Sequence, residues 1–313
     1  MLISLVCTVK NEADNIARLL DSMLAQTRCA DEIVVNDCGS TDNTAALVQD
    51  YIARGAAIRL VAGGFNISSG RNSAIAHANG PIIASTDAGL TLDPHWLARI
   101  VAPIEADEAD LVAGFYQAAP QTALEMAIGA TNYPNADEID PARFLAAGQS
   151  VAFRKTVWER VGGYPEWLDH CEDLVFDRAA LAAGFRGTAA LDAVVHFRPR
   201  SSLGTLARQY FFYARGDGMA NLWPRRHAIR YATYLAAFVI IRLSRRFPAL
   251  LALLALGGVV YTRQPYRRLW RASHDFPLPK RACVLLLPPV VRVVGDCAKM
   301  LGYPVGWWRR GRS

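Results

Sequence analysis

Residues 32–42 read Glu-Ile-Val-Val-Asn-Asp-Cys-Gly-Ser-Thr-Asp, an apolar strand followed at once by a polar turn. Asp37 stands where this strand ends, and Asp87 stands at the same point after the apolar run 81–86. Ligands of open α/β sheets bind at the carboxyl ends of the strands. Polar residues repeated at that edge predict a polar ligand, a cation beside it and one acid left for chemistry. Three later residues stand at comparable positions, namely Glu172, Asp173 and His196.

Strand and helix patterns alternate along the first two thirds of the chain. Apolar runs typical of buried strands occupy 3–9, 32–36, 58–61, 81–86, 111–116, 149–154 and 193–195. Helical spacing or capping residues mark 13–25, 40–51, 71–78, 94–104, 156–160, 172–183 and 203–215. The pattern is looser between residues 121 and 148. This order predicts an α/β fold with a mostly parallel sheet in three layers.

The charges are unevenly distributed. The 313 residues include 34 Lys and Arg against 28 Asp and Glu, a net charge of +6. Basic residues concentrate in the C-terminal third, whereas most acids precede Asp192. This asymmetry favours an anionic partner, which we take to be a membrane surface rather than nucleic acid. The six cysteines form no C-x-x-C pair, and no signal peptide is recognisable at residues 2–9, so we expect a reducing, cytosolic setting.

The C-terminal third contains three strongly apolar segments at 231–241, 247–261 and 282–294, each bracketed by arginines. None reaches the length of about 20 apolar residues that spans a bilayer. Arginines on both sides of each segment favour helices that lie in the cytoplasmic face of the cell (inner) membrane. A second soluble helical core is the alternative. We therefore divide the chain into a catalytic range, 1–220, and a helical membrane-associated range, 221–313.

The chemistry of individual residues leaves alternatives open. Asp37 can accept a hydrogen bond from a base or ribose, or it can only cap the next helix. Arg71 follows a glycine-bearing loop and suits a diphosphate at a helix N-terminus, but it can equally be a surface charge. Asp87 ends a buried strand, where a carboxylate is costly unless it is paired or bound to a metal. The pair Glu172-Asp173 opens a helix, whose dipole should keep both carboxylates ionised at neutral pH. The pair can supply a general base, or it can only decorate the first turn of that helix.

The ordered set of motifs resembles the family 2 inverting glycosyltransferases over roughly residues 1 to 220. The motifs are Cys7-Thr8-Val9-Lys10-Asn11-Glu12, Gln26 with residues 31–44, Gly70-Arg71-Asn72, Thr86-Asp87-Ala88-Gly89, Gly162-Gly163-Tyr164, Glu172-Asp173 with Arg178, and residues 209–216. The last of these is similar to a helix of exopolysaccharide-type members. The resemblance implies the nucleotide-diphospho-sugar transferase fold, which is Rossmann-like, and a nucleotide-diphospho-sugar donor.

The same resemblance implies roles for the site residues. Thr8, Glu12, Asp37 and Arg71 should hold the nucleotide. Asp87 should meet the ribose and the metal-bound diphosphate, and His196 should join Asp87 at the metal. Asp173 should deprotonate the acceptor hydroxyl, with Glu172 on the acceptor side. The implied cofactor is a divalent cation, Mg²⁺ or Mn²⁺.

Two features of the sequence refine this expectation. Gly89 replaces the second acid of the D-x-D motif, which puts strict metal dependence in question. The Q-x-x-R-W motif of processive synthases is absent, which favours addition of one sugar, and the basic, apolar C-terminal range favours a lipid-linked acceptor. Two other classes stay open: a sugar nucleotidyltransferase, and a non-catalytic membrane-bound scaffold descended from a glycosyltransferase.

Overall fold

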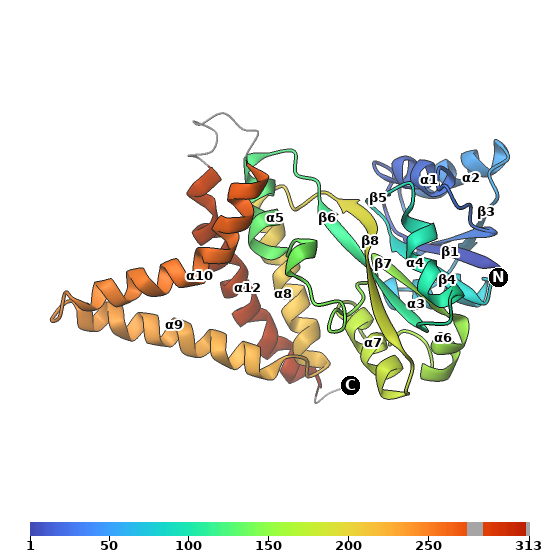
Figure 1. Cartoon of the computed structure of the whole chain (residues 1–313). Helices are drawn as coiled ribbons and strands as arrows, with labels where there is room; N and C mark the ends of the chain where they lie inside the picture. The colour runs from blue at the N-terminus through green and yellow to red at the C-terminus, as the bar shows by residue number, and fades with distance from the viewer. Residues whose placement is uncertain (274–283, 311–313) are drawn as a thin grey trace. The chain divides into compact units, whose positions relative to one another are not determined.

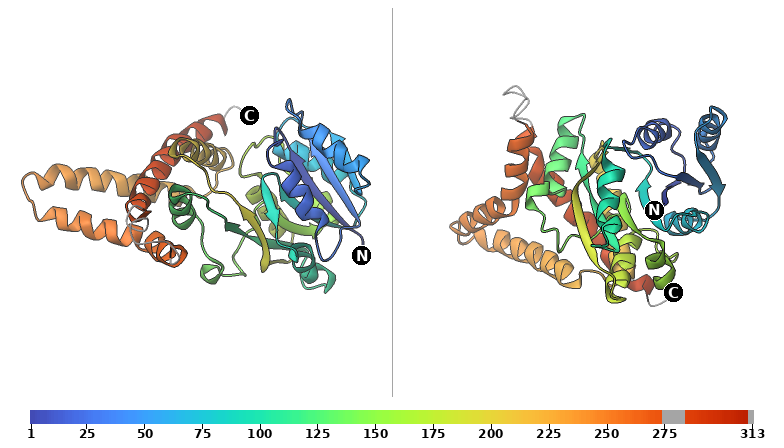
Figure 2. Two further views of the ribbon diagram at one scale, coloured as in Figure 1. Left: turned by 90° about the horizontal axis from the view of Figure 1, so that it is seen from above. Right: turned by 45° about the vertical axis from the view of Figure 1, so that its right-hand side comes forward.

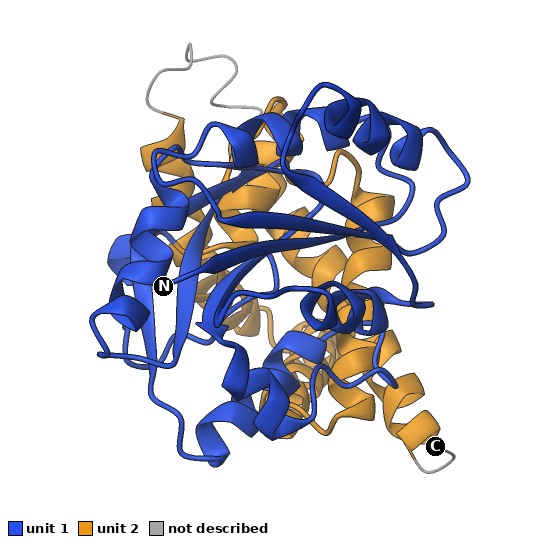
Figure 3. Ribbon diagram, turned by 90° about the vertical axis from the view of Figure 1, so that its right-hand side faces the viewer, with its two compact units in different colours: residues 1–117, 135–198 blue, residues 118–134, 199–313 orange. Residues whose placement is uncertain are grey.

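The structure is a computed structural model that describes residues 1–273 and 284–310. The chain divides into two compact units, which Figure 3 distinguishes by colour. Unit 1 consists of residues 1–117 and 135–198, and unit 2 consists of 118–134 and the described residues from 199 onward. Residues 118–134 and 199–220 thus pack with the C-terminal helices, although the sequence analysis placed them in the catalytic range. The functional boundary near residue 220 stays a prediction.

Unit 1 is built around one eight-stranded sheet (Figure 1). Its strands are β1 (Ile3–Val9), β2 (Glu32–Asp37), β3 (Ile58–Ala62), β4 (Ile82–Asp87), β5 (Leu90–Leu92), β6 (Leu111–Ala118), β7 (Ser150–Arg154) and β8 (Gly187–Phe197). Every strand predicted from the sequence is present. β5 was not predicted, because three residues are too few for a periodic pattern, and β8 is longer than its apolar end suggests.

The spatial order of the strands is β3-β2-β1-β4-β7-β6-β8-β5. β1 pairs in parallel with β2 and with β4, and β2 pairs in parallel with β3. β7 joins antiparallel to β4, β6 joins antiparallel to β7, and β5 joins antiparallel to β8. The predicted parallel sheet is therefore confirmed for the half that contains β1 to β4, and the whole sheet is mixed.

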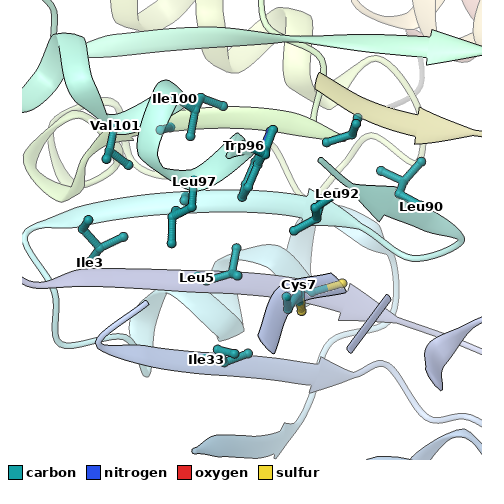
Figure 4. Close-up of a cluster of buried hydrophobic side chains, with 14 of the residues drawn as sticks. Ile3, Leu5, Cys7, Ile33, Leu90, Leu92, Trp96, Leu97, Ile100 and Val101 are labelled. Carbon is teal, nitrogen blue, oxygen red and sulfur yellow. The ribbon is translucent and has the colours of Figure 1, made fainter. Parts of the chain in front are cut away.

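Helices cover both faces of the sheet. Alternate residues of a strand point to opposite faces, so one strand contributes side chains to two hydrophobic cores. Ile3, Leu5 and Cys7 of β1 belong to one hydrophobic core, which Figure 4 shows in close-up, whereas Val6 belongs to a second. The first core includes residues of α1 (Ile16–Leu24), α2 (Thr44–Ala53) and α4 (Trp96–Glu105). The second includes residues of α3 (Ile67–Ala76), α6 (Lys155–Val161) and α7 (Glu172–Ala182). The predicted three layers are confirmed.

Helix α3 begins four residues earlier than the sequence pattern indicated. The side chain of Asn66 accepts a hydrogen bond from the backbone N–H of Ser69, and the Ser69 hydroxyl accepts one from the Asn66 backbone. This capping box fixes the helix start. Arg71 consequently lies inside α3, so the prediction that it flanks a helix N-terminus is wrong.

Unit 2 is helical. Among its described residues are the helices α5 (Ala123–Asn132), α8 (Leu203–Met219), α9 (Pro224–Ser244), α10 (Leu250–Ala272) and α12 (Leu287–Arg310). α5 lies in the range where the sequence pattern was loose. The apolar segments at 231–241 and 247–261 lie within α9 and α10, while residue 282 and Cys283 of the third lie outside the described residues. Across the described ranges, we find no helix with the length and apolar character needed to cross a membrane.

Candidate active site

The carboxyl ends of three parallel strands bring three predicted site residues together. Thr8 on β1 is level with Asp87 on β4, and Val9 is level with Asp37 on β2. Thr8 and Asp37 are almost fully buried. The carboxylate of Asp37 accepts hydrogen bonds from the backbone N–H and the hydroxyl of Ser40, at 3.0 and 2.6 Å. The turn after β2 therefore holds this carboxylate in one orientation at the ligand-binding edge of the sheet.

The hydroxyl of Thr8 is a buried polar atom at this edge that has no partner within the described part of the chain. A buried hydroxyl without a hydrogen bond costs free energy that a ligand atom can recover. Thr8 stands between Asn36 on β2 and Asp87 on β4 in the strand register. Its position and its missing partner are consistent with the predicted contact to a nucleotide.

Arg71 is the buried centre of the site. Its guanidinium donates to Asp87 Oδ1 from Nη2 at 2.7 Å and to Glu172 Oε1 from Nη1 at 2.9 Å. The side chain of Arg71 is only 2% exposed, and the guanidinium also lies over the ring of Tyr164, 4.8 Å from its centroid. The predicted role of Arg71 as a nucleotide ligand stays a prediction. What the geometry establishes is that Arg71 links Asp87 on β4 to the acidic pair that opens α7.

Gly148 completes the surroundings of Arg71. A Cβ atom added to Gly148 would lie 2.5 Å from Nη2 of Arg71, so any larger residue would displace the guanidinium. The backbone N–H of Gly148 donates to Oδ2 of Asp173 at 3.1 Å. Neither Gly148 nor Tyr164 was assigned a role from the sequence. The Gly162-Gly163-Tyr164 motif was a signal for Tyr164, whereas nothing in the sequence around Gly148 pointed to Arg71.

Burial governs the protonation of the acidic pair. Burial raises the pKa of Glu172 to about 7, and the nearby guanidinium of Arg71 lowers it only in part. Burial likewise raises the pKa of Asp173 above its ordinary value, against the opposing hydrogen bond from the Gly148 N–H and the charge of Arg71. The sequence analysis expected the start of α7 to keep both carboxylates ionised. Loss of solvent instead raises the pKa of both carboxyls, despite the hydrogen bonds and the charge of Arg71 that lower it.

Asp177, one helical turn beyond Asp173, is a further buried acid that the sequence analysis did not identify. Burial, followed by the charge of Asp173, raises the pKa of its carboxyl well above the ordinary value. Its Oδ2 atom has no hydrogen-bond partner among the described residues. Burial and the charge of Asp173 thus both favour the protonated form of Asp177, which reduces the negative charge close to Asp173.

Gly89 and Glu12 meet at the position of the missing second acid. Gly89 has φ of +79°, a left-handed conformation that disfavours larger residues, and the nearest atom to a Cβ added there would be Oε2 of Glu12, at 3.8 Å. Glu12 is partly exposed and accepts a hydrogen bond from the side chain of Asn15 at 3.0 Å. The carboxylate nearest to the second D-x-D position is therefore that of Glu12, which comes from the loop after β1.

His196 lies on β8, level with Thr91 of β5. Over the described ranges 1–273 and 284–310, no three His, Cys, Asp or Glu side chains gather in a group that could hold a metal ion. The structure thus does not assemble Asp87 and His196 into a protein-only metal site. Their predicted metal role stays a prediction.

Comparison with known proteins identifies the class. A sequence model described as "Glycosyl transferase family 2" matches residues 4–155, which include β1 to β7 and most of the site. Residues 4–155 therefore form a family 2 glycosyltransferase domain, and the chain is a glycosyltransferase.

Two curated relatives illustrate the range of the family. The chain is 28% identical over 247 residues to glycosyltransferase AglE of Haloferax volcanii, covering 76% of this chain and 80% of that protein. It is 30% identical over 119 residues to dodecaprenyl-phosphate galacturonate synthase of Rhizobium johnstonii, covering 36% of this chain and 35% of that protein.

Solved structures show the same fold. The mannosyltransferase PcManGT of Pyrobaculum calidifontis, in complex with GDP-Man and Mn²⁺, superposes with a TM-score of 0.60 at 19% identity, covering 98% of this chain and 87% of that one. TarS of S. aureus in complex with UDP-GlcNAc gives a TM-score of 0.54 at 17% identity, covering 99% and 92%. The predicted nucleotide-diphospho-sugar transferase fold is confirmed.

Proposed function

We propose that this enzyme transfers a single sugar, with inversion, from a nucleotide-diphospho-sugar to a hydroxyl of a lipid-linked saccharide, in the synthesis of a cell-surface polysaccharide or glycolipid. The observation that carries the proposal is the chain of contacts Asp87, Arg71, Glu172 and the adjoining Asp173. It joins the donor-binding edge of the sheet to a buried acid that is suited to take a proton.

Each part of the site has a defined task in this reaction. Thr8 and Asp37 bind the nucleoside, and Asp87 orients the diphosphate side of the donor. Asp173 accepts the proton of the acceptor hydroxyl, which attacks the anomeric carbon on the face opposite the departing diphosphate. Inversion follows because there is one displacement. The raised pKa of Asp173 makes it a stronger base than an exposed aspartate, provided that it is ionised when the acceptor binds.

The residues present fit a divalent cation that is completed by the donor. Asp87 uses Oδ1 for Arg71 and has no hydrogen bond to Oδ2 within the described residues. Mg²⁺ and similar ions at phosphate sites take one or two carboxylates, with water and phosphate oxygens as the other ligands. Asp87 would hold the ion with His196, and when bound the ion would neutralise charge on the leaving diphosphate. The Mn²⁺ and GDP-Man complex of PcManGT supports this proposal by analogy.

The exposed surface of α9 and α10 supports a lipid-linked acceptor at the cytoplasmic face of a membrane. The two helices form a hairpin, seen from two sides in Figure 2. Its outward side chains are large and apolar: Ile229, Leu235, Phe238, Val239, Ile241, Leu243, Leu251, Leu253, Leu256, Val259 and Val260 are all more than 40% exposed. A surface of this kind favours insertion at the boundary between the headgroups and the acyl chains of a bilayer. The name of the Rhizobium relative refers to a dodecaprenyl phosphate, which agrees with this proposal.

The proposed function is tested by substituting the base. Asp173→Asn should lower the rate of sugar transfer by about 10²–10⁴-fold, the usual contribution of a general base, and should leave donor affinity unchanged. Asp192→Asn, an exposed acid of the same unit, is the matched control. The donor is found first by screening nucleotide sugars for thermal stabilisation. Near-normal transfer by Asp173→Asn, or a product that retains the anomeric configuration, would contradict the proposal.

A further inference from the structure

Two acids of α7 hold the segment of chain that precedes β7, and both elements belong to unit 1 (Figure 1). The backbone N–H of Gly148 donates to Oδ2 of Asp173 at 3.1 Å. One helical turn further along α7, the carboxyl of Asp177 is hydrogen-bonded to the backbone of Ala146. The segment 144–150 is therefore attached to α7 at two points, one at the proposed base and one at an acid that the proposed reaction does not use.

The same segment also contacts the buried arginine of the site. A Cβ atom added to Gly148 would lie 2.5 Å from Nη2 of Arg71, so the guanidinium lies directly against this backbone. A hydrogen bond of 2.9 Å closes the turn 147–150, and the hydroxyl of Thr86 donates to the carbonyl of Gln149 at 3.1 Å. A shift of Gly148 would consequently change both the hydrogen bond to Asp173 and the space that Arg71 occupies.

Packing alone does not account for an acid at position 177. Asp177 is only 1% exposed, and a cavity of about 20 Å³, enough for one water molecule, is lined by Asp177, Ala146, Leu111 and Leu181 among other residues. A leucine would fill this space without the cost of burying a carboxyl group. The hydrogen bond to the backbone of Ala146 is the one interaction here that an apolar side chain cannot make.

The contact between Gly148 and Asp173 affects the protonation of the base. Burial raises the pKa of Asp173, and the hydrogen bond from the Gly148 N–H is the largest effect that lowers it, because it stabilises the carboxylate. Loss of this hydrogen bond would therefore raise the pKa of Asp173 further. The other titratable groups that act electrostatically on Asp173 or on Asp177 are Arg71, Asp87, Tyr164 and Glu172.

We propose that Asp177 is a positioning residue for the general base: by holding Ala146, its carboxyl keeps the N–H of Gly148 on Asp173 and the backbone of Gly148 against Arg71. This inference rests on the proposed function, which makes Asp173 the base. Asp177 acts through the segment 144–150 and not through contact with a substrate. An uncharged acceptor is enough for this role, so an amide can replace the carboxyl.

The first test measures the segment itself in the full-length protein. Asp177→Asn keeps an oxygen that can accept from Ala146, whereas Asp177→Leu removes the acceptor and has the cavity as room for its additional methyl group. Hydrogen exchange of the peptide that covers residues 144–150, followed by mass spectrometry, should be about tenfold faster in Asp177→Leu and unchanged in Asp177→Asn. Asp177→Ala is the second variant, in case the leucine variant does not fold.

The second test is the pH dependence of kcat, which a general loss of stability would not shift. With the donor found by the thermal screen, kcat of Asp177→Leu should fall about tenfold at pH 6 and much less at pH 8.5, because less of the base is ionised at the acidic end. Asp177→Asn should follow wild type. Leu181→Ala is the matched control, since it changes the same helix and the same cavity without removing an acceptor, and it should also follow wild type.

The outcomes separate this inference from the proposed function. An unchanged pH profile in Asp177→Leu would overturn the inference, whether or not exchange is faster. Equal losses in Asp177→Asn and Asp177→Leu would also overturn it, because they would assign the effect to the charge or the proton of Asp177. If Asp173→Asn transfers sugar at the normal rate, the proposed function fails instead, and hydrogen exchange still decides whether Asp177 holds the segment.

Discussion

Replacing Arg71 with methionine should destabilise unit 1 more than any loss of a surface ion pair. The guanidinium pairs with Asp87 and Glu172 at 2.7 and 2.9 Å, and the side chains of Arg71 and Glu172 are 2% and 7% exposed. Methionine keeps much of the volume over the ring of Tyr164, so the main loss is electrostatic. Removing one partner of a buried ion pair costs about 3–5 kcal/mol, because it leaves a charge buried without compensation.

The pH determines how large the loss of unfolding free energy in Arg71→Met is. Glu172 already has a pKa of about 7 beside Arg71, and removing the positive charge raises this pKa further. At pH 8 the variant therefore either keeps an uncompensated Glu172 carboxylate or must protonate this carboxylate although the proton concentration is low. At pH 5.5 the carboxyl is largely neutral in both proteins. We expect a loss of about 3–5 kcal/mol at pH 8 and roughly half of that at pH 5.5.

The assay is urea unfolding of the full-length chain, followed by tryptophan fluorescence at both pH values. Arg28→Met is the control, because Arg28 makes two hydrogen bonds of 2.8 Å to Glu105 while its side chain is 36% exposed. A pair of that kind contributes at most about 1 kcal/mol. The reasoning is refuted if Arg71→Met costs no more than Arg28→Met, or if its cost is the same at both pH values.

Three other substitutions test the surroundings of the site and the packing of unit 2. Between pH 4.5 and about 7 the native carboxyl of Glu172 holds a proton that the unfolded chain has released, so wild-type stability should fall as pH rises through this window, by up to about 3 kcal/mol. Glu172→Gln should reduce that slope in urea unfolding, and the raised pKa values of Asp173 and Asp177 should leave the rest of it. Gly148→Ala places a methyl group 2.5 Å from Nη2 of Arg71, and it should cost about 1–3 kcal/mol and lower kcat in steady-state assays. Gly302→Leu, whose Cβ would lie 2.2 Å from a backbone carbonyl of α8, should lower the thermal midpoint, whereas Gly257→Leu, with open space around it, should not.

Much of unit 1 could be predicted because its strands are buried on both faces and read as continuous apolar runs. The prediction for β1 matches residue by residue, and the acids at the strand ends follow directly from the parallel arrangement. Helix α3 was placed too late because Asn66, Ser68 and Ser69 resemble a loop in sequence. Only their hydrogen bonds show that Asn66 and Ser69 cap a helix.

The contacts of Arg71 could not be predicted from local patterns. Its partners stand 16 and 101 residues away in the sequence, and Gly148 stands 77 residues away. Periodicity reports which face of an element is buried, but it does not report which distant residue lies opposite. The raised pKa of Glu172 could not be predicted for the same reason. A helix start is visible in the sequence, whereas the depth at which Glu172 is buried depends on the packing of the whole unit.

The pairing of α8 with α12 changes how membrane association should be tested. Gly302 and Gly306 of α12 approach the backbone of α8 so closely that added Cβ atoms would lie 2.2 Å from Phe211 O and 2.0 Å from Arg215 O. Such backbone-to-backbone packing depends on glycine at the contact. A chain ended near residue 221 would remove α12 and uncover this surface of α8, so poor solubility of that chain would say nothing about lipid. Replacing exposed apolar residues of the hairpin, such as Phe238 and Val260, with glutamine keeps α8 and α12 together. Loss of vesicle binding in those variants, with unchanged thermal stability, is the outcome expected if α9 and α10 contact the membrane.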